Sequence, residues 1–223
     1  WQIVLENLYA ALEITGAPAK AAGSVFWGTH QRFFGAVINA LKMPSVIREI
    51  ERDLAEGRSV VLQLVNTGEA QQERAFARIS EELGLDDLDL SPKETVIRYV
   101  EKAFPVQQYE TFEDEEGNIR SRPMVDANGK PIENPEAIRL REALLTRLAG
   151  LRVPENALDQ LIEHFGPAQV AEITGRKRRR VAGRWTKSGQ AEIETRGDPA
   201  VRRDKQLFYD DKKPILVFSG KGG

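Results

Sequence analysis

The chain has 223 residues, of which 41% are hydrophobic and 30% charged, and its formal net charge is −2. This composition is typical of a soluble globular protein, and the net charge argues against a surface covered by nucleic acid. With no cysteine and only two histidines, disulfides and thiolate metal sites are excluded and a zinc centre is improbable. No apolar stretch reaches the roughly 18 residues of a membrane span, and no signal peptide opens the chain, so we expect a cytoplasmic protein without membrane contact.

The first 41 residues predict a helical lead-in that packs on a main domain at residues 42–223. Residues 1–15 carry apolar side chains at helical spacing. Residues 24–41 (SVFWGTHQRFFGAVINAL) are rich in aromatic side chains, which we interpret as packing a helix onto the main domain. Stacking of these rings on nucleic-acid bases is the alternative.

Residues 44–83 predict a helix, a strand, a loop and a second helix. The apolar run at 60–65, rich in valine, is typical of a strand buried on both faces of a parallel sheet. A polar turn follows, and the second helix begins at Glu69. In open α/β sheets ligands bind at the loops that leave the carboxyl ends of strands. Residues 67–69 are therefore a candidate binding loop.

Residues 86–151 are interpreted as a helical and irregular insertion into the α/β domain. A capping box at Ser91 predicts one helix, and Asn134 caps a second that runs to about residue 148. Between the two helices, turn signals at 116–118 and 127–129 predict a hairpin or an irregular excursion.

The last third of the chain predicts a helix from 156 to 165, a strand at 169–174 and a basic loop. The loop contains five consecutive cations at 176–180 (RKRRR), and it follows directly after a strand end. Such a run forms either a solvated surface or a track for phosphates, and both interpretations stay open. A hairpin arm is expected at 189–198, and a buried strand at 214–219.

The final strand leads into the residues SGKGG at 219–223. Glycines with a lysine after a strand are similar to the beginning of a deviant P-loop, although the second Gly-Lys and the Ser/Thr are absent. Because the chain begins inside a predicted helix and stops inside this glycine-rich loop, we expect a fragment of a longer polypeptide.

Four collinear blocks carry a resemblance to a known family. They are FWGTHQRFF with the following VVLQLVNTGEA, then PENALDQLIEHFG, VAEITGRKRRRV and DKQLFYDDKKPILVFSGKGG. Together they resemble the C-terminal helicase domain of the strawberry notch family. The resemblance covers nearly the whole chain, with a looser match at residues 86–132.

This resemblance implies the second RecA-like lobe of a superfamily 2 helicase, with a parallel sheet of the P-loop NTPase type. The full-length protein would bind DNA or RNA and would hold ATP and Mg²⁺ between this lobe and a first RecA-like lobe. The catalytic groups would lie outside this chain, so the fragment alone is expected to be inactive. The alternatives are a degenerate helicase-like module that acts as a regulatory scaffold, or a deviant P-loop ATPase that begins at 215–223.

The expected site residues fall into three groups at the ends of three strands. Backbone contacts with nucleic acid are expected at Thr67, Gly68, Glu69, Thr174 and Gly175. Electrostatic tracking of phosphates is expected from Arg176, Lys177, Arg178, Arg179 and Arg180. Coupling to the nucleotide is expected from Ser219, Gly220, Lys221, Gly222 and Gly223.

Overall fold

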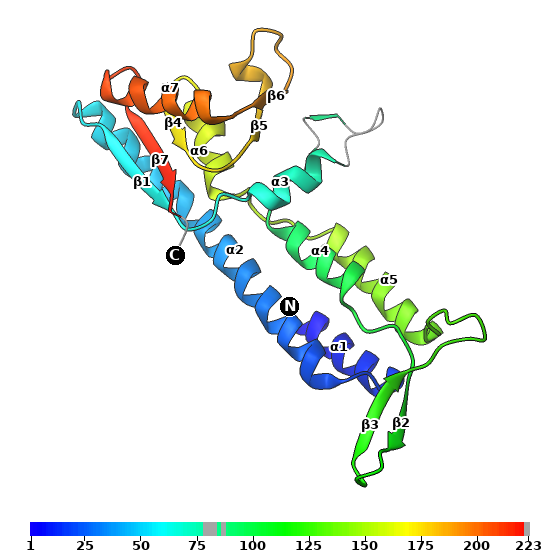
Figure 1. The fold of residues 1–223 in the computed structure, drawn as a ribbon. Helices are drawn as coiled ribbons and strands as arrows, with labels where there is room; N and C mark the ends of the chain where they lie inside the picture. The colour runs from blue at the N-terminus through cyan, green and yellow to red at the C-terminus, as the bar shows by residue number, and fades with distance from the viewer. Residues whose placement is uncertain (78–83, 86–87, 221–223) are drawn as a thin grey trace. The chain divides into compact units, whose positions relative to one another are not determined.

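The computed structural model describes residues 1–77, 84–85 and 88–220 (Figure 1). They form two compact units, one made of residues 1–33 and 93–152 and the other of residues 34–92 and 153–223. The domain boundaries expected from the sequence, at residue 41 and around 86–151, stay predictions.

The second unit is built on a parallel sheet of three strands in the order β1-β7-β4. The strands are β1 (Val60–Leu64), β4 (Val170–Ile173) and β7 (Ile215–Ser219). Ile215 in the central strand pairs with Val60 on one side and Val170 on the other. This confirms the predicted parallel sheet with flanking helices. Since all three strands run in the same direction, the loops that follow them emerge at one edge.

The expectation that β1 is buried on both faces is wrong. Its residues alternate between half-buried and exposed, and Val61 is 56% exposed. β1 lies at the border of the described sheet, and only the face with Val60, Leu62 and Leu64 packs on the core.

The core of this unit lies between the sheet and two helices, α2 (Ala19–Ala55) and α6 (Ala157–Phe165). Met43 and Ile50 of α2 pack with apolar residues of α6 and with sheet residues, which are Val170, Ile215 and Val217. Helix α7 (Asp198–Tyr209) packs against β4 and β7.

Two separate helices were expected at 24–41 and 44–56, but α2 is continuous through Pro44. A proline inside a helix removes one backbone hydrogen bond, which usually kinks or ends the helix. Here a side chain of α6 supplies the missing donor, because Gln160 donates to the carbonyl of Ala40. The backbone hydrogen bond that the proline removes is thus replaced by a tertiary contact.

The first unit contains α1 (Gln2–Thr15), α4 (Lys93–Lys102), α5 (Pro135–Ala149) and a hairpin of β2 (Tyr109–Glu113) with β3 (Ile119–Pro123). The predicted cap of α5 is confirmed, since Asn134 accepts hydrogen bonds from the amides of Glu136 and Ala137. Phe26 is fully buried, which favours the packing interpretation of the aromatic segment.

A helix and a hairpin with a short 3-10 helix lie beside the sheet in the second unit. Helix α3 (Glu69–Phe76) follows β1, and the remainder of the helix predicted to residue 83 lies largely outside the described residues. β5 (Arg178–Val181) pairs with β6 (Glu192–Thr195) in an antiparallel hairpin, and a short 3-10 helix, η2 (Gly183–Trp185), lies between them. No described helix combines the length and apolar character that a membrane crossing requires.

Candidate functional site

The loops after β1, β4 and β7 meet at one edge of the sheet, as predicted. A Cβ atom placed on Gly175, after β4, would lie 3.8 Å from Oε2 of Glu69, after β1. A Cβ atom on Gly220, after β7, would lie 3.5 Å from Nε2 of Gln63 in β1. The geometry therefore brings together three of the predicted segments.

The loop after β1 is held by internal contacts. Thr67 and Gly68 are buried, and the amide of Gly68 donates to Oδ1 of Asn66 at 2.8 Å. Gly68 has a positive φ of 72°, and a Cβ atom there would lie only 2.5 Å from Nδ2 of Asn156. Glycine is thus required for the turn and for close packing. Gly68 therefore determines the conformation of this loop, and its amide hydrogen bonds to Asn66 and not to a ligand.

The loop after β4 presents a more accessible backbone. The hydroxyl of Thr174 donates to Oε1 of Glu172 at 2.7 Å and accepts from the amide of Arg176 at 3.3 Å. Gly175, between them, is exposed. The backbone of Gly175 is therefore accessible at the surface, while Thr174 and Arg176 on either side of it are held by hydrogen bonds.

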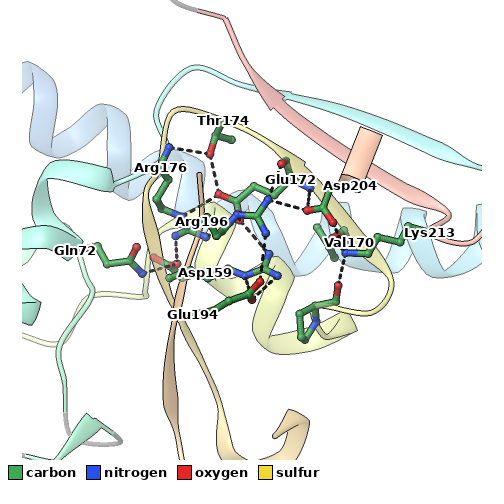
Figure 2. A network of polar contacts seen from close by, with 12 residues as sticks. Gln72, Asp159, Val170, Glu172, Thr174, Arg176, Glu194, Arg196, Asp204 and Lys213 are labelled. Carbon is green, nitrogen blue, oxygen red and sulfur yellow. Dashed lines mark hydrogen bonds and ion pairs between the residues drawn. The ribbon is translucent and has the colours of Figure 1, made fainter. Parts of the chain in front are cut away.

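Glu172 is the centre of the polar network beneath this loop (Figure 2). Arg176 donates to both of its carboxylate oxygens, at 3.0 and 3.1 Å, and Arg179 donates to Oε2 at 3.1 Å. The main-chain carbonyl of Glu172 accepts from Arg196 at 2.9 Å. One residue in β4 thus binds three guanidinium groups that lie further along the chain.

Asp204 in α7 forms a second centre. Its carboxylate accepts from Lys213 at 2.6 Å, from Arg196 at 2.7 Å and from the amide of Glu172 at 3.1 Å. The network as a whole contains four cations and four carboxylates, which are Arg176, Arg179, Arg196, Lys213, Asp159, Glu172, Glu194 and Asp204.

Burial and paired charge shift the pKa values of these carboxylates in different directions. Burial raises the pKa of Glu172, but the guanidinium groups around it, Arg176 foremost, outweigh burial and lower the pKa to about 2. Burial also raises the pKa of Asp159, and there the charge of Arg176 only partly offsets it. Burial likewise raises the pKa of Asp204, but its hydrogen bonds, those with Lys213 and Arg196 among them, lower it overall. The network therefore favours the charged form of both Glu172 and Asp204.

The structure argues against one of the two interpretations of the basic run at 176–180, a solvated surface, because four of its five residues are buried or half-buried. Arg176 and Arg179 are only 1% and 2% exposed, so these two side chains do not offer charge to a phosphate in this conformation. Arg178 pairs with Glu73, and Arg180 pairs with Glu155 at 2.8 Å. Lys177 is the exposed member of the run.

These side chains are buried or paired because Arg178, Arg179 and Arg180 lie in β5 of the hairpin and Arg176 lies just before it. Side chains of a strand alternate between two faces, and β5 buries Arg179 and Val181 while Arg178 and Arg180 stay half-buried. Arg179 lies opposite Glu194 across the hairpin and pairs with it. The alternating acids of residues 192–195 (EIET) were the available sequence signal for this pairing.

The loop after β7 is described only in part. Ser219 is half-buried and Gly220 exposed, while Lys221, Gly222 and Gly223 lie outside the described residues. Within the described ranges, no group of three or more His, Asp or Glu side chains could hold a metal ion.

Comparison with known proteins finds strawberry notch relatives. A family model described as "C-terminal domain on Strawberry notch homologue" matches residues 156–223, which contain α6, β4, the β5–β6 hairpin, α7 and β7. Protein strawberry notch homolog 1 of Rattus norvegicus is 25% identical over 98% of this chain. The chain is therefore similar to strawberry notch proteins over nearly its whole length, and residues 156–223 match the family's C-terminal domain.

Other curated proteins match shorter stretches of the chain at higher identity. Protein strawberry notch of Drosophila melanogaster is 37% identical over 37% of this chain, and Protein FORGETTER 1 of Arabidopsis thaliana is 33% identical over 38% of it. The chain spans less than a quarter of the length of the curated relatives that match nearly all of it. It covers 23% of the rat protein and 21% of Protein strawberry notch homolog 2 of Mus musculus. No solved structure matches the chain.

Proposed function

We propose that this chain is the second RecA-like lobe of an ATP-dependent superfamily 2 helicase or translocase, and that it grips the DNA or RNA backbone at the edge formed by the loops after β1 and β4. The observation that carries the proposal is the meeting of these loops at one edge of a parallel sheet, in a chain of a helicase-domain family. In such sheets this edge is where ligands bind. A cytoplasmic location belongs to the same proposal.

The contacts proposed with phosphates follow from exposure and charge. The backbone of Gly175 is exposed, and the next residue but one, Lys177, adds an exposed cation. Arg176 and Arg179 support the loop from below, because their guanidinium groups pair with Glu172. Phosphate contacts of this kind fix the position of a nucleic acid without reading its sequence.

ATP and Mg²⁺ belong to the proposed full-length protein. They would lie between this lobe and a first RecA-like lobe, and the loop after β7, with Ser219 and Gly220, would couple the grip on nucleic acid to the nucleotide. Two lobes that close on a γ-phosphate move their grips relative to each other.

The test is a salt titration with fluorescent single-stranded and duplex oligonucleotides of mixed sequence. We expect weak binding that does not depend on sequence. Lys177→Ala should reduce the slope of log affinity against log salt by about 0.7 for single strands and about 0.9 for duplexes, the value of one phosphate contact. Lys130→Ala is the matched control, because it removes the same charge from an exposed position in the first unit.

Two outcomes contradict the proposal. One is the absence of binding at low salt to either oligonucleotide. The other is an equal effect of Lys177→Ala and Lys130→Ala, which would show that net charge, and not the strand-end edge, determines binding.

A further inference from the structure

The turn of the β5–β6 hairpin contains a hollow that none of the predicted site residues explains. It has a volume of about 600 Å³. Its lining residues are Pro167, Val181, Trp185, Thr186, Lys187, Ser188, Glu192 and Glu194. Trp185 is the only aromatic side chain among them, and it is 39% exposed.

The indole of Trp185 is held in one orientation. Its Nε1–H donates to the carbonyl of Glu163 at 2.9 Å. Gly166 packs directly on the ring system, since a Cβ atom there would lie 2.8 to 3.1 Å from three of the indole carbons. A large aromatic surface that is both fixed and partly exposed can stack on a flat ligand without a further loss of side-chain freedom.

The loop around the tryptophan is also held by internal hydrogen bonds. The hydroxyl of Thr186 donates to the carbonyl of Gln190 at 2.8 Å, and the hydroxyl of Ser188 donates to Glu192 at 2.6 Å. Of the two carboxylates in the hollow, Glu192 therefore accepts from Ser188, while Glu194 pairs with Arg179. The hollow keeps its shape without a ligand.

Cations lie next to the indole. The guanidinium of Arg184 lies 5.5 Å from the centre of the ring and pairs with Glu163, and Lys187 is exposed in the same turn. An aromatic surface beside positive charge matches a nucleotide, which combines a flat base with a phosphate. A cage for a methylated ammonium group would need further aromatic walls, and no other lining residue is aromatic.

We propose that the hollow binds one unpaired nucleobase, stacked on Trp185. This inference rests on the proposed function, because the base belongs to the same strand that contacts the loop after β4. β5 connects the two places and has four residues, so they lie roughly 10 Å apart. That separation corresponds to about three stacked nucleotides at ~3.4 Å each. The stacked base would give the lobe a preference for single strands.

The test compares Trp185→Ala with the unchanged chain on a single-stranded oligonucleotide and on an abasic oligomer of equal length. Stacking on one aromatic residue contributes about 1–3 kcal/mol, so the affinity for the base-containing strand should fall about 5- to 150-fold. The affinity for the abasic oligomer and the salt slope should not change, because no phosphate contact is lost. Trp185→Phe should retain most of the affinity.

Trp27→Ala is the matched control, since Trp27 is also partly exposed but lies in the first unit. Circular dichroism shows whether each variant is folded. A second measurement does not depend on a disruptive variant: with Trp1 and Trp27 replaced by phenylalanine, the fluorescence of Trp185 should be quenched by the base-containing strand and not by the abasic oligomer.

The outcomes separate the two proposals. Equal binding of both oligomers, with no effect of Trp185→Ala and no quenching, overturns the nucleobase site and leaves the backbone grip in place. Quenching by a proline-rich or methyl-lysine peptide, and not by the oligonucleotide, assigns the hollow to a protein partner and overturns the inference. The absence of all nucleic-acid binding overturns both.

Discussion

The side-chain amide of Gln160 donates a hydrogen bond of 3.1 Å to the carbonyl of Ala40, four residues before Pro44. In a regular helix the amide of residue 44 would be the donor, and proline has none. Gln160 also donates to the carbonyl of Glu155 at 2.6 Å, which fixes its side chain. The continuity of α2 in the second unit thus depends on a residue of α6.

Gln160→Ala should destabilise the chain by about 1 kcal/mol, because the carbonyl of Ala40 loses its donor. In the Pro44→Ala background the backbone amide returns as the donor, so the same substitution should cost less. Urea unfolding of the four proteins in this double-mutant cycle measures the difference. Equal costs in the two backgrounds would show that Gln160 does not substitute for the missing amide.

Glu172→Gln should lower the free energy of unfolding by about 3 kcal/mol near neutral pH, since it leaves buried guanidinium groups without their carboxylate. The pKa of Glu172 is depressed from 4.5 to about 2. Its contribution is therefore fully present above about pH 4.5 and is lost as the pH falls towards 2.

The difference in stability between the unchanged chain and Glu172→Gln should accordingly shrink over that range. Both proteins contain Asp159, whose pKa is raised, so its opposite contribution largely cancels in the comparison. Chemical denaturation at several pH values gives the measurement. A difference that stays constant from pH 6 to pH 3 would contradict the prediction.

Gly68→Ala should cost about 2–4 kcal/mol. The residue has a positive φ, which is unfavourable for alanine by about 1 kcal/mol, and its Cβ would also overlap Asn156. Gly57→Ala is the matched control, because its φ is 75° and no atom lies within 4 Å of the added Cβ. Thermal or urea unfolding compares the two. If both variants lose the same stability, the close approach to Asn156 is unimportant.

Glu73→Gln should strengthen nucleic-acid binding. Arg178 pairs with Glu73 and its side chain is 39% exposed, so loss of the partner charge makes a cation available near the strand ends. The affinity should rise and the salt slope should become steeper by up to about 0.7 for single strands. Glu110→Gln, which breaks an exposed pair with Arg122 in the first unit, is the control. No gain over that control would place Arg178 outside the interface.

The chain alone should not hydrolyse ATP, because the resemblance assigns the catalytic groups to other parts of a full-length helicase. A phosphate-release assay with Mg²⁺ and with or without oligonucleotide measures this. Turnover that co-purifies with the 223-residue chain, and is lost in Gly220→Pro, would instead support the deviant P-loop alternative.

The sheet was predictable from the sequence because its signals are local. Apolar runs define β1 and β7, and polar, glycine-containing loops follow them, so the order of segments indicates parallel strands that share an edge. The cap of α5 was predictable for the same reason, because Oδ1 of Asn134 accepts from the amides two and three residues further on.

The state of the basic run was not predictable, because its charges are cancelled by residues distant in the chain. Arg178 pairs with Glu73, which is 105 positions away, and Arg176 pairs with Asp159. A run of cations has the same local signature whether it is solvated or buried. The same holds for Pro44, where the missing donor comes from Gln160, 120 positions from Ala40.

The balance of charge around Glu172 has a consequence for the rate of binding. Arg176 and Arg179 are paired within this network, and Arg178 and Arg180 are paired with Glu73 and Glu155, so the basic run of the sequence produces only a weak field beyond the surface. Encounter with nucleic acid should then proceed near the unsteered rate of about 10⁵–10⁶ M⁻¹s⁻¹, far below electrostatically steered association. Under the proposed function, a lobe that approaches slowly would depend for recruitment on the longer protein that carries it, once that protein has reached the strand.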